Sequence, residues 1–198
     1  MQDGPLQHLI KMLSGLPGLG NRSARRLALH MLTNKEQVML PLAQLIERTA
    51  NEIQTCSRCG NLDMYDPCKI CQDVKRNPGQ ICVVAQVSDL WAIERTSAYK
   101  GQYHILGGLL SALDGVGPDQ LNIENLLTRA QDSAVTEIIL ALSATVDGQS
   151  TAHYIADHID RGGLEVTYLA HGVPVGGELD YLDDGTITTA LKSRKKSA

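Results

Sequence analysis

Four cysteines in two closely spaced pairs constrain this 198-residue chain more than any other feature. They follow the pattern Cys56-x2-Cys59-x8-Cys68-x2-Cys71. Each pair can present two thiolates to one tetrahedral ion, and Zn²⁺ favours four soft sulfur ligands. A site closed by four cysteines leaves no position for a substrate, so its role would be structural. The pattern predicts one structural zinc ion, with a redox pair or an iron–sulfur cluster as the alternatives.

Hydropathy and the first residues indicate where such a chain works. No apolar run reaches the roughly 18 residues of a membrane span, and the start of the chain lacks the basic and apolar parts of a signal peptide. We therefore expect a cytoplasmic protein with no membrane association. In that reducing compartment clustered cysteines are more often metal ligands than disulfides. The fifth cysteine, Cys82, lies in a short apolar run and is expected to be a buried core thiol.

The N-terminal quarter of the chain has the apolar spacing of helices. A first helix is predicted over about 5–15 and a second over about 21–31, separated by a segment at 16–20 that is rich in Gly and Pro. Thr33 followed by Glu36 resembles a capping box, which would open a third helix. These features indicate a compact helical region before the cysteines.

The turn between the first two helices has the composition of a phosphate-binding hairpin. Gly18 and Gly20 would let backbone amides approach phosphates closely, and the N-terminus of the next helix favours anions. Arg22 and Arg26, one helical turn apart, would add charge-assisted phosphate contacts, and Arg25 lies beside them. Such contacts position a protein on DNA without reading its sequence. The alternative is a plain turn between two helices.

Charge is distributed unevenly along the chain, although the net charge is only −4. Residues 1–32 carry four basic residues and one acid, a net +3, whereas residues 137–190 carry nine acids and one arginine, a net −8. This asymmetry favours a nucleic-acid surface at one end and a different partner at the other. Ordinary scatter of surface charge is the alternative.

Beyond the cysteines the chain alternates short apolar runs with helical patterns. Residues 55–79 have a loop-like composition, and a helix capped by Ser88 is expected after the first apolar run. Strands are predicted at 81–84, 103–106, 137–142 and 164–169, and further helices at 123–130 and 151–159. Strands that alternate with helices predict a mostly parallel sheet covered on both faces.

The third of these strands runs into a segment similar to the Toprim domain of topoisomerases and primases. In that domain carboxylates after two strands hold Mg²⁺ for chemistry at phosphates. Here Ser143 and Thr145 stand in place of two Asp, Asp147 and Gln149 in place of two Glu, and Ala85 in place of the Glu that ends the first strand. Ala, Ser and Thr cannot build such a cation site. The sequence also has no phosphate-binding G-x-x-x-x-G-K-[ST] loop.

The order of these parts resembles the RecR family of bacterial recombination mediators along essentially the whole chain. Further stretches agree with the family: Ser88–Thr96, Tyr103–Gly108, Ser111–Pro118 and His171–Tyr181. The resemblance implies a multi-part α/β fold with an N-terminal helix-hairpin-helix, a small four-cysteine zinc module, a Toprim-like sheet flanked by helices and a C-terminal tail. The corresponding boundaries are 1–54, 55–79, 80–172 and 173–198.

The resemblance also implies a function without catalysis. RecR-like proteins form ring-shaped homo-oligomers, typically tetramers, that clamp single-stranded, gapped or duplex DNA. With RecO, and in many bacteria RecF, they help RecA load on single strands coated by single-stranded-DNA-binding protein. By this resemblance Arg22, Arg26 and Arg25 would contact DNA together with Gly18 and Gly20. A nucleoid-associated location is implied as well.

The Toprim-like surface of the family engages RecO, which makes Asp147 the candidate partner-binding residue. This chain departs from the family at that surface, since Ser143-Ala144 replaces the usual Asn-Pro and Asp147 the usual Glu. Two other functions remain open. One is a Mg²⁺-dependent enzyme that uses Asp89, Glu94 and Asp147, and the other is a zinc-module protein that binds only proteins.

Overall fold

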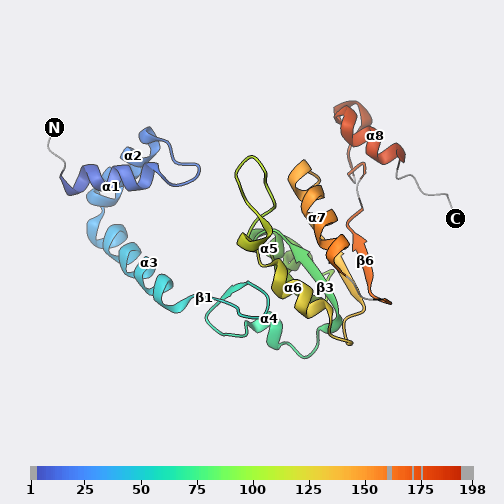
Figure 1. Ribbon diagram of the computed structural model, residues 1–198. Coiled ribbons are helices and arrows are strands. Elements are labelled where there is room, and N and C mark those ends of the chain that lie inside the picture. The colour runs from blue at the N-terminus through green and yellow to red at the C-terminus, as the bar shows by residue number, and fades with distance from the viewer. Residues whose placement is uncertain (1–3, 160–161, 171, 175, 193–198) are drawn as a thin grey trace. The chain divides into compact units, whose positions relative to one another are not determined.

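A computed structural model describes residues 4–159, 162–170, 172–174 and 176–192. The chain divides into two compact units, Met1–Ile53 and Gln54–Ala198 (Figure 1). Among the described helices, none combines the length and the apolar character that a bilayer span requires.

The N-terminal unit is helical, as the apolar spacing predicts. Helix α1 spans Pro5–Ser14 and α2 spans Asn21–Thr33, which confirms the first two predicted helices. A π-helical turn, η1, spans Lys35–Met39 and leads directly into α3, Leu40–Glu52. Helices α1 and α2 pack on one another, so these helices and the turn between them form one hairpin.

The predicted capping box at Thr33 is wrong. Thr33 is the last residue of α2, and its hydroxyl donates a hydrogen bond of 2.8 Å to the carbonyl of Leu29. The residue before η1 is Asn34, which makes no side-chain cap. A Thr hydroxyl can bond back to the preceding turn of its own helix. Thr33 makes that bond and therefore does not cap the helical segment that follows.

The second unit is built on a four-stranded sheet whose pairs are all parallel, as predicted. Its strands lie in the order β4-β3-β5-β6. They span Asn77–Val84 (β3), Gly101–Ile105 (β4), Glu137–Leu140 (β5) and Glu165–Tyr168 (β6). In this register Cys82 of the central strand β3 lies between Tyr103 of β4 and Ile139 of β5.

Three helices accompany the sheet: α5 (Val87–Thr96), α6 (Ile123–Ala130) and α7 (Val146–His158). The predicted cap at Ser88 is wrong, because Gln86 caps α5 and its amide bonds to the Asp89 carboxylate at 2.9 Å. Helix α7 begins at Val146, before the predicted position. The Thr145 hydroxyl accepts a hydrogen bond from the Gly148 amide and so starts the helix there.

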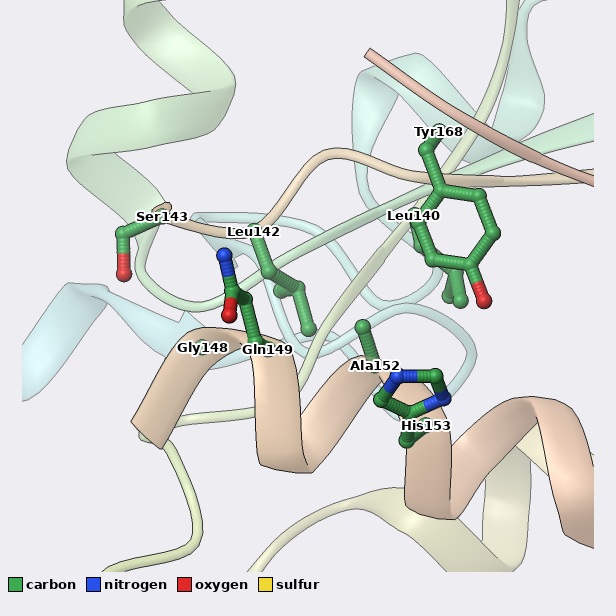
Figure 2. Close-up of a pocket in the computed structure, with 8 residues that line it drawn as sticks. All are labelled: Leu140, Leu142, Ser143, Gly148, Gln149, Ala152, His153 and Tyr168. Carbon is green, nitrogen blue, oxygen red and sulfur yellow. The ribbon is translucent and has the colours of Figure 1, made fainter. Parts of the chain in front are cut away.

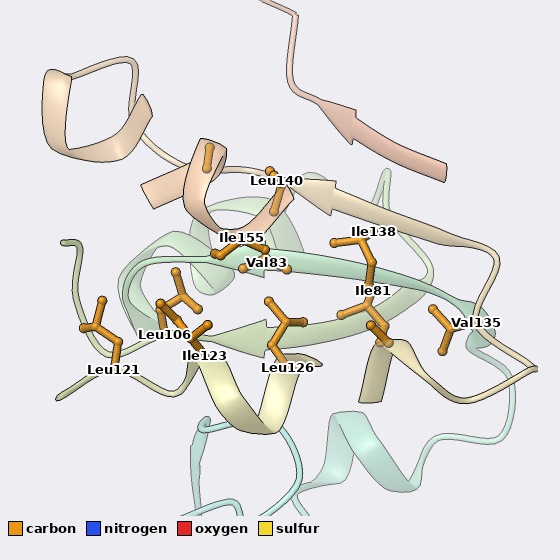
Figure 3. Packing of buried hydrophobic residues seen from close by; sticks show 12 residues of the cluster. Ile81, Val83, Leu106, Leu121, Ile123, Leu126, Val135, Ile138, Leu140 and Ile155 are labelled. Carbon is orange, nitrogen blue, oxygen red and sulfur yellow. The ribbon is translucent and has the colours of Figure 1, made fainter. Parts of the chain in front are cut away.

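The two faces of the sheet are covered differently. Ile81 and Val83 of β3 point into a core closed by α6 and α7, which supply Leu126 and Ile155 among others (Figure 3). The alternate residues of β3 belong to a second core that contains Leu90 of α5 and all four clustered cysteines. Both faces are therefore covered, as expected, and the cysteine module takes the place of a second helix on one of them.

Residues 55–79 contain more regular structure than their loop-like composition indicates. The short strands β1 (Gln54–Thr55) and β2 (Leu62–Asp63) pair antiparallel, and α4 spans Lys69–Gln72. Beyond the sheet lie a 3-10 turn η3 (Leu179–Tyr181) and α8 (Asp184–Lys192). The basic residues Arg194, Lys195 and Lys196, like His171 and Val175 of the C-terminal stretch, lie outside the described residues.

Candidate functional site

The hairpin between α1 and α2 leaves backbone amides available at its tip. Gly18 has a φ of +79°, in the left-handed region that favours glycine. Gly20 is extended and is the N-cap of α2, and it offers no side-chain acceptor to the first amides of that helix. Those amides keep the partial positive charge of a helix N-terminus, so an anion can bind there.

The arginines of α2 face away from the packed side of the hairpin. Ala24 and Ala28 are fully buried, whereas Arg22, Arg25 and Arg26 are exposed on the first two turns of the helix. None of the three arginines forms an ion pair within the described part of the chain. The first turn of α2 also holds no acidic residue. These cations are therefore free to meet an anionic ligand.

A shallow groove of about 510 Å³ runs along the same helix. It is lined by Leu19, Ser23, Arg26, Leu27 and His30. Its walls combine a cation, a hydroxyl and apolar side chains. This mixture suits a ligand that presents phosphate next to less polar groups.

The four clustered cysteines form a zinc centre. All four are buried, and their Sγ atoms lie within 4.8 Å of one another. Two of the Sγ–Sγ separations are 3.6 Å, between Cys59 and Cys68, and 4.0 Å, between Cys56 and Cys71. A tetrahedral ion with Zn–S bonds of about 2.3 Å needs sulfurs about 3.8 Å apart, so the arrangement fits one Zn²⁺. With four sulfur ligands the site is closed and structural.

The first knuckle is held in place by the parallel sheet. The Cys56 amide donates to the Asn61 carbonyl at 2.7 Å, and the Gly60 amide donates to the Cys56 carbonyl at 2.9 Å. The Cys59 carbonyl in turn accepts a hydrogen bond of 2.7 Å from the amide of Ile105 in β4. The knuckle thereby covers part of the free edge of β4, a strand in which every residue is buried.

Two aspartates, which the sequence interpretation did not single out, shape the segment between the knuckles. Oδ1 of Asp66 accepts hydrogen bonds of 2.8 Å from both the amide and the hydroxyl of Ser57. Oδ2 of Asp63 accepts one of 2.9 Å from the amide of Lys69. Asp is common in turns for this reason, so composition alone gave no specific signal.

Cys82, predicted to be a core thiol, is buried on β3 beside the zinc ligands but is not one of them. Burial raises the pKa of its thiol to about 12. The group is therefore a neutral packing element, because only a thiolate is a good nucleophile or ligand.

The position that holds cations in Toprim enzymes is built differently here. The hydroxyls of Ser143 and Thr145 lie 2.8 Å apart, and the Thr145 hydroxyl also caps α7. A pocket of about 210 Å³ opens beside them (Figure 2). It is lined by Leu140, Leu142, Ser143, Gly148, Gln149, Ala152, His153 and Tyr168. No carboxylate is among these residues, so the pocket offers no acidic ligand to a cation.

The alternative acid set does not assemble. Asp89 accepts a hydrogen bond from the Gln86 amide at the start of α5, Asp147 lies in the first turn of α7, and Glu94 forms an ion pair with Arg76. Among the residues that the structure describes, the four cysteines are the one group of three or more potential ligands close enough to share an ion. The alternative combination of Asp89, Glu94 and Asp147 is therefore not brought together.

Glu94 is instead the centre of a structural network. Its carboxylate accepts hydrogen bonds from the Arg76 guanidinium, one of them at 3.0 Å, and from the Tyr103 hydroxyl at 2.7 Å. Burial by itself would raise the pKa of Glu94, but the bonds from Arg76 and Tyr103 outweigh it, and the pKa is lowered. The network joins the segment after α4 to α5 and β4.

His104 and Arg129 form a second network that the sequence interpretation missed. His104 is fully buried in β4, its Nε2 lies 2.6 Å from the Asn122 carbonyl, and its Nδ1 lies 3.0 Å from the Arg129 guanidinium. Burial lowers the pKa of His104 to about 4. The ring is therefore neutral, with Nε2 donating and Nδ1 accepting. No spacing motif connects these residues, so the sequence held no signal for them.

Comparisons with known proteins cover the chain nearly from end to end. Four family models match it: RecR, helix-hairpin-helix (residues 6–50); RecR, four-cysteine zinc finger domain (53–73); Toprim domain (79–170); and RecR, C-terminal (172–195). The chain is 58% identical over 193 residues to the recombination protein RecR of Paramagnetospirillum magneticum, covering 97% of this chain and 98% of that protein. It is 56% identical to the RecR of Rhodopseudomonas palustris, with 96% of each chain covered.

Proposed function

Because the chain belongs to the RecR family of recombination proteins, we propose that it is a DNA-binding recombination mediator with no catalytic activity of its own. In this role it acts with RecO, and with RecF where that protein is present, to help RecA load on single strands coated by single-stranded-DNA-binding protein at gaps. The observation that carries the proposal is the set of exposed, unpaired arginines directly after the glycine turn of the hairpin.

Binding of DNA through the hairpin is supported by two features of α2 together. The amides at its N-terminus are uncapped by any side chain, and Arg22 and Arg26 stand one turn apart on its exposed side. Both groups suit phosphate oxygens and neither reads base identity. We assign the phosphate contacts to Arg22, Arg26 and Arg25, with Gly18 and Gly20 allowing the close approach of the strand.

A role without catalysis is supported by the residues at the Toprim cation position. Ser143 and Thr145 bond to each other, and no carboxylate lines the adjacent pocket. Asp147 is half-buried in the first turn of α7, and we assign it to the surface that binds RecO.

Incubation of the protein with Mg²⁺ and supercoiled plasmid tests whether the protein has catalytic activity. Sustained nicking that Asp147→Ala abolishes would contradict a role without catalysis.

Self-assembly is supported by the apolar surface of the N-terminal unit. Leu45 and Ile46 of α3 are 58% and 61% exposed, and Met12 and Leu16 near α1 are 65% and 51% exposed. An apolar surface of this extent on so small a unit is typical of a protein–protein interface. We propose that it packs against other copies of the chain in a closed ring, the tetramer expected for the family.

We also propose that the functional division of the chain follows the boundaries 1–54, 55–79, 80–172 and 173–198, and that the protein acts in the cytoplasm at the nucleoid. In this division the first part meets DNA and the third meets RecO. The zinc module lies between them in the sequence and shares a core with β3 and β4 of the sheet.

The decisive experiment measures the DNA-dependent ATP hydrolysis of RecA on single strands coated by single-stranded-DNA-binding protein, with cognate RecO and with or without this protein. Clear acceleration is expected, together with its loss in Arg22→Ala/Arg26→Ala. Arg48→Ala is the matched control, because Arg48 is an exposed arginine of α3 already paired with Glu52. The control should retain the acceleration.

Two other results would change the assignment. Acceleration that survives Arg22→Ala/Arg26→Ala would keep the mediator function but move the DNA contact away from the hairpin. No acceleration by the unaltered protein would overturn the mediator function, and a scaffold that binds only proteins would take its place.

A further inference from the structure

Arg129 on α6 is a cation without a carboxylate partner. Its guanidinium donates to the Tyr103 carbonyl at 2.8 Å and to Nδ1 of His104 at 3.0 Å. Both acceptors are neutral: the first is a backbone carbonyl, and the second belongs to a histidine whose pKa is lowered by burial. Arg129 forms no ion pair with Asp or Glu among the residues that the structure describes. A partly buried charge needs a compensating charge nearby, and the hydrogen bonds do not supply one.

The zinc module packs against the same stretch of α6 and β4. Asn125, one helical turn before Arg129, donates a hydrogen bond of 3.3 Å to the carbonyl of Ser57 in the first knuckle. The Cys59 carbonyl accepts a hydrogen bond from Ile105 of β4. Two residues earlier in the same strand, the Tyr103 carbonyl accepts a hydrogen bond from Arg129. The helix position of Arg129 and the strand that binds it therefore both adjoin the zinc ligands.

A second cation, Arg58, lies near Arg129 beside the zinc module. Arg58, within the first knuckle, lines a small cavity of about 150 Å³ together with Arg129. Asp132 lines the same cavity, so one carboxylate is close to the two guanidinium groups. Burial lowers the pKa of Arg129, Cys71 acts to raise it, and Arg58 acts to lower it.

Four thiolates around one Zn²⁺ carry a net charge of about −2, which is costly to bury unless positive groups lie nearby. We propose that Arg129 is the counter-cation of the zinc centre, and that its guanidinium, assisted by Arg58, stabilises the four-thiolate form of the site from β4 and α6. Arg129 is a positioning residue in this sense and does not bind the metal. The neutral His104 fixes the direction of the guanidinium through Nδ1.

The test compares zinc release to a chromogenic chelator from the full-length protein and its variants at neutral pH. Arg129→Gln removes the charge but keeps an amide that can donate to Tyr103. Release is expected to be about tenfold faster or more, as for other groups that support metal ligands from outside the ligand shell. Arg129→Lys, which keeps the charge, should restore slow release at least in part. Arg95→Gln removes an exposed arginine of α5 and should release zinc at the rate of the unaltered protein.

A second measurement separates charge from packing. The melting temperature of each protein is taken with zinc bound and after the metal is stripped. If Arg129 balances the thiolate charge, Arg129→Gln lowers the melting temperature of the zinc-bound form more than that of the stripped form. An equal loss in both forms, with zinc release unchanged, would overturn the proposal and leave Arg129 as a packing residue.

Two further outcomes also decide against the proposal. Zinc release from Arg129→Lys as fast as from Arg129→Gln would mean that the charge of Arg129 does not slow zinc release.

If Arg129→Gln fails to fold, Arg58→Gln takes its place, because Arg58 is exposed and lines the same cavity. It should accelerate release in the same direction by a smaller factor, and unchanged release in that variant would overturn the shared role of the two cations.

Discussion

The carbonyl of Cys59 accepts a hydrogen bond of 2.7 Å from the amide of Ile105, so the first zinc knuckle is bonded directly to the edge strand of the parallel sheet. The zinc ligands also share a core with Cys82, Leu90 and Tyr103 of the sheet and its helix. The zinc centre is therefore part of the unit that carries the Toprim-like sheet. Metal binding and the stability of that sheet should be coupled.

Replacing one zinc ligand tests this coupling. Cys59→Ser should lose the bound metal and lower the stability of the sheet-containing unit by several kcal/mol, because the free energy of metal binding is also folding energy. Zinc content, the melting temperature and hydrogen exchange of the β4 amides measure the effect. Cys82→Ala is the control, since Cys82 is buried in the same core but is no ligand, and it should keep its zinc. Full zinc content in Cys59→Ser would refute the four-cysteine site.

The turn of the first knuckle should tolerate no side chain at Gly60. This residue has a φ of +79°, and a Cβ there would lie 2.9 Å from the Ile105 carbonyl oxygen. Gly60→Ala should combine backbone strain with a clash against β4 and cost about 2–4 kcal/mol of unfolding free energy. Gly107→Ala isolates the strain, because Gly107 has a φ of +84° with open space around it, and it should cost about 1 kcal/mol. Equal losses in chemical denaturation would show that the clash with β4 is absent.

The network around Glu94 should make stability depend on pH. The folded-state pKa of Glu94 is lowered, so its contribution is present above the unfolded pKa of about 4.3 and is lost as pH falls through the folded value. Because the carboxylate is partly exposed, solvent screens the pair, and Glu94→Gln should cost about 1 kcal/mol at pH 7 and much less near pH 3. Urea denaturation at both values measures this difference.

Glu52→Gln is the matched control for the Glu94 experiment. Glu52 also pairs with an arginine, Arg48, but both side chains are exposed. Exposed pairs of this kind contribute little to stability, so this variant should unfold almost as the unaltered protein does. A loss in Glu94→Gln that is no larger than the loss in Glu52→Gln, or that is the same at both pH values, would show that the Glu94 network is not an ionic one.

A buried hydroxyl within α7 holds the segment after β4 against the helix. Oγ1 of Thr151 donates to the Asp147 carbonyl at 2.6 Å and accepts from the Leu110 amide at 2.9 Å, which ties the segment after β4 to the helix. Thr151→Val keeps the shape but leaves the Leu110 amide without its acceptor, so we expect a loss of about 1–2 kcal/mol. Thr128→Val removes an exposed hydroxyl bonded to Glu124 and should change stability little. Thermal unfolding of both variants checks the difference.

Features with a local physical cause were predictable from the sequence. The cysteine spacing determined the zinc ligands, because two C-x-x-C pairs suit one tetrahedral ion wherever they lie in a fold. Alternating apolar runs and helical patterns determined a parallel sheet covered on both faces, and all four strands were located. The hairpin between α1 and α2 followed from the breakers at 16–20. Its arginines as DNA contacts stay a prediction.

Helix starts were predicted less well, because neighbouring polar side chains compete for the same amides. Thr33 bonds back to Leu29, Gln86 replaces Ser88 as the cap of α5, and Thr145 starts α7 earlier than its apolar spacing indicates. In each case the sequence offered several capping groups of similar strength.

Only the tertiary structure decided which distant residues share an environment. Cys59 bonds to Ile105, Arg76 pairs with Glu94, and Arg129 bonds to the Tyr103 carbonyl of β4. No periodicity records such pairs, because they depend on how strands, helices and the zinc loop are stacked. The sequence by itself determined which atoms bind the metal. The stacking of the fold decided that the first zinc knuckle bonds to the edge of the sheet and that the zinc ligands share a core with its strands, because burial exists only once the chain is packed.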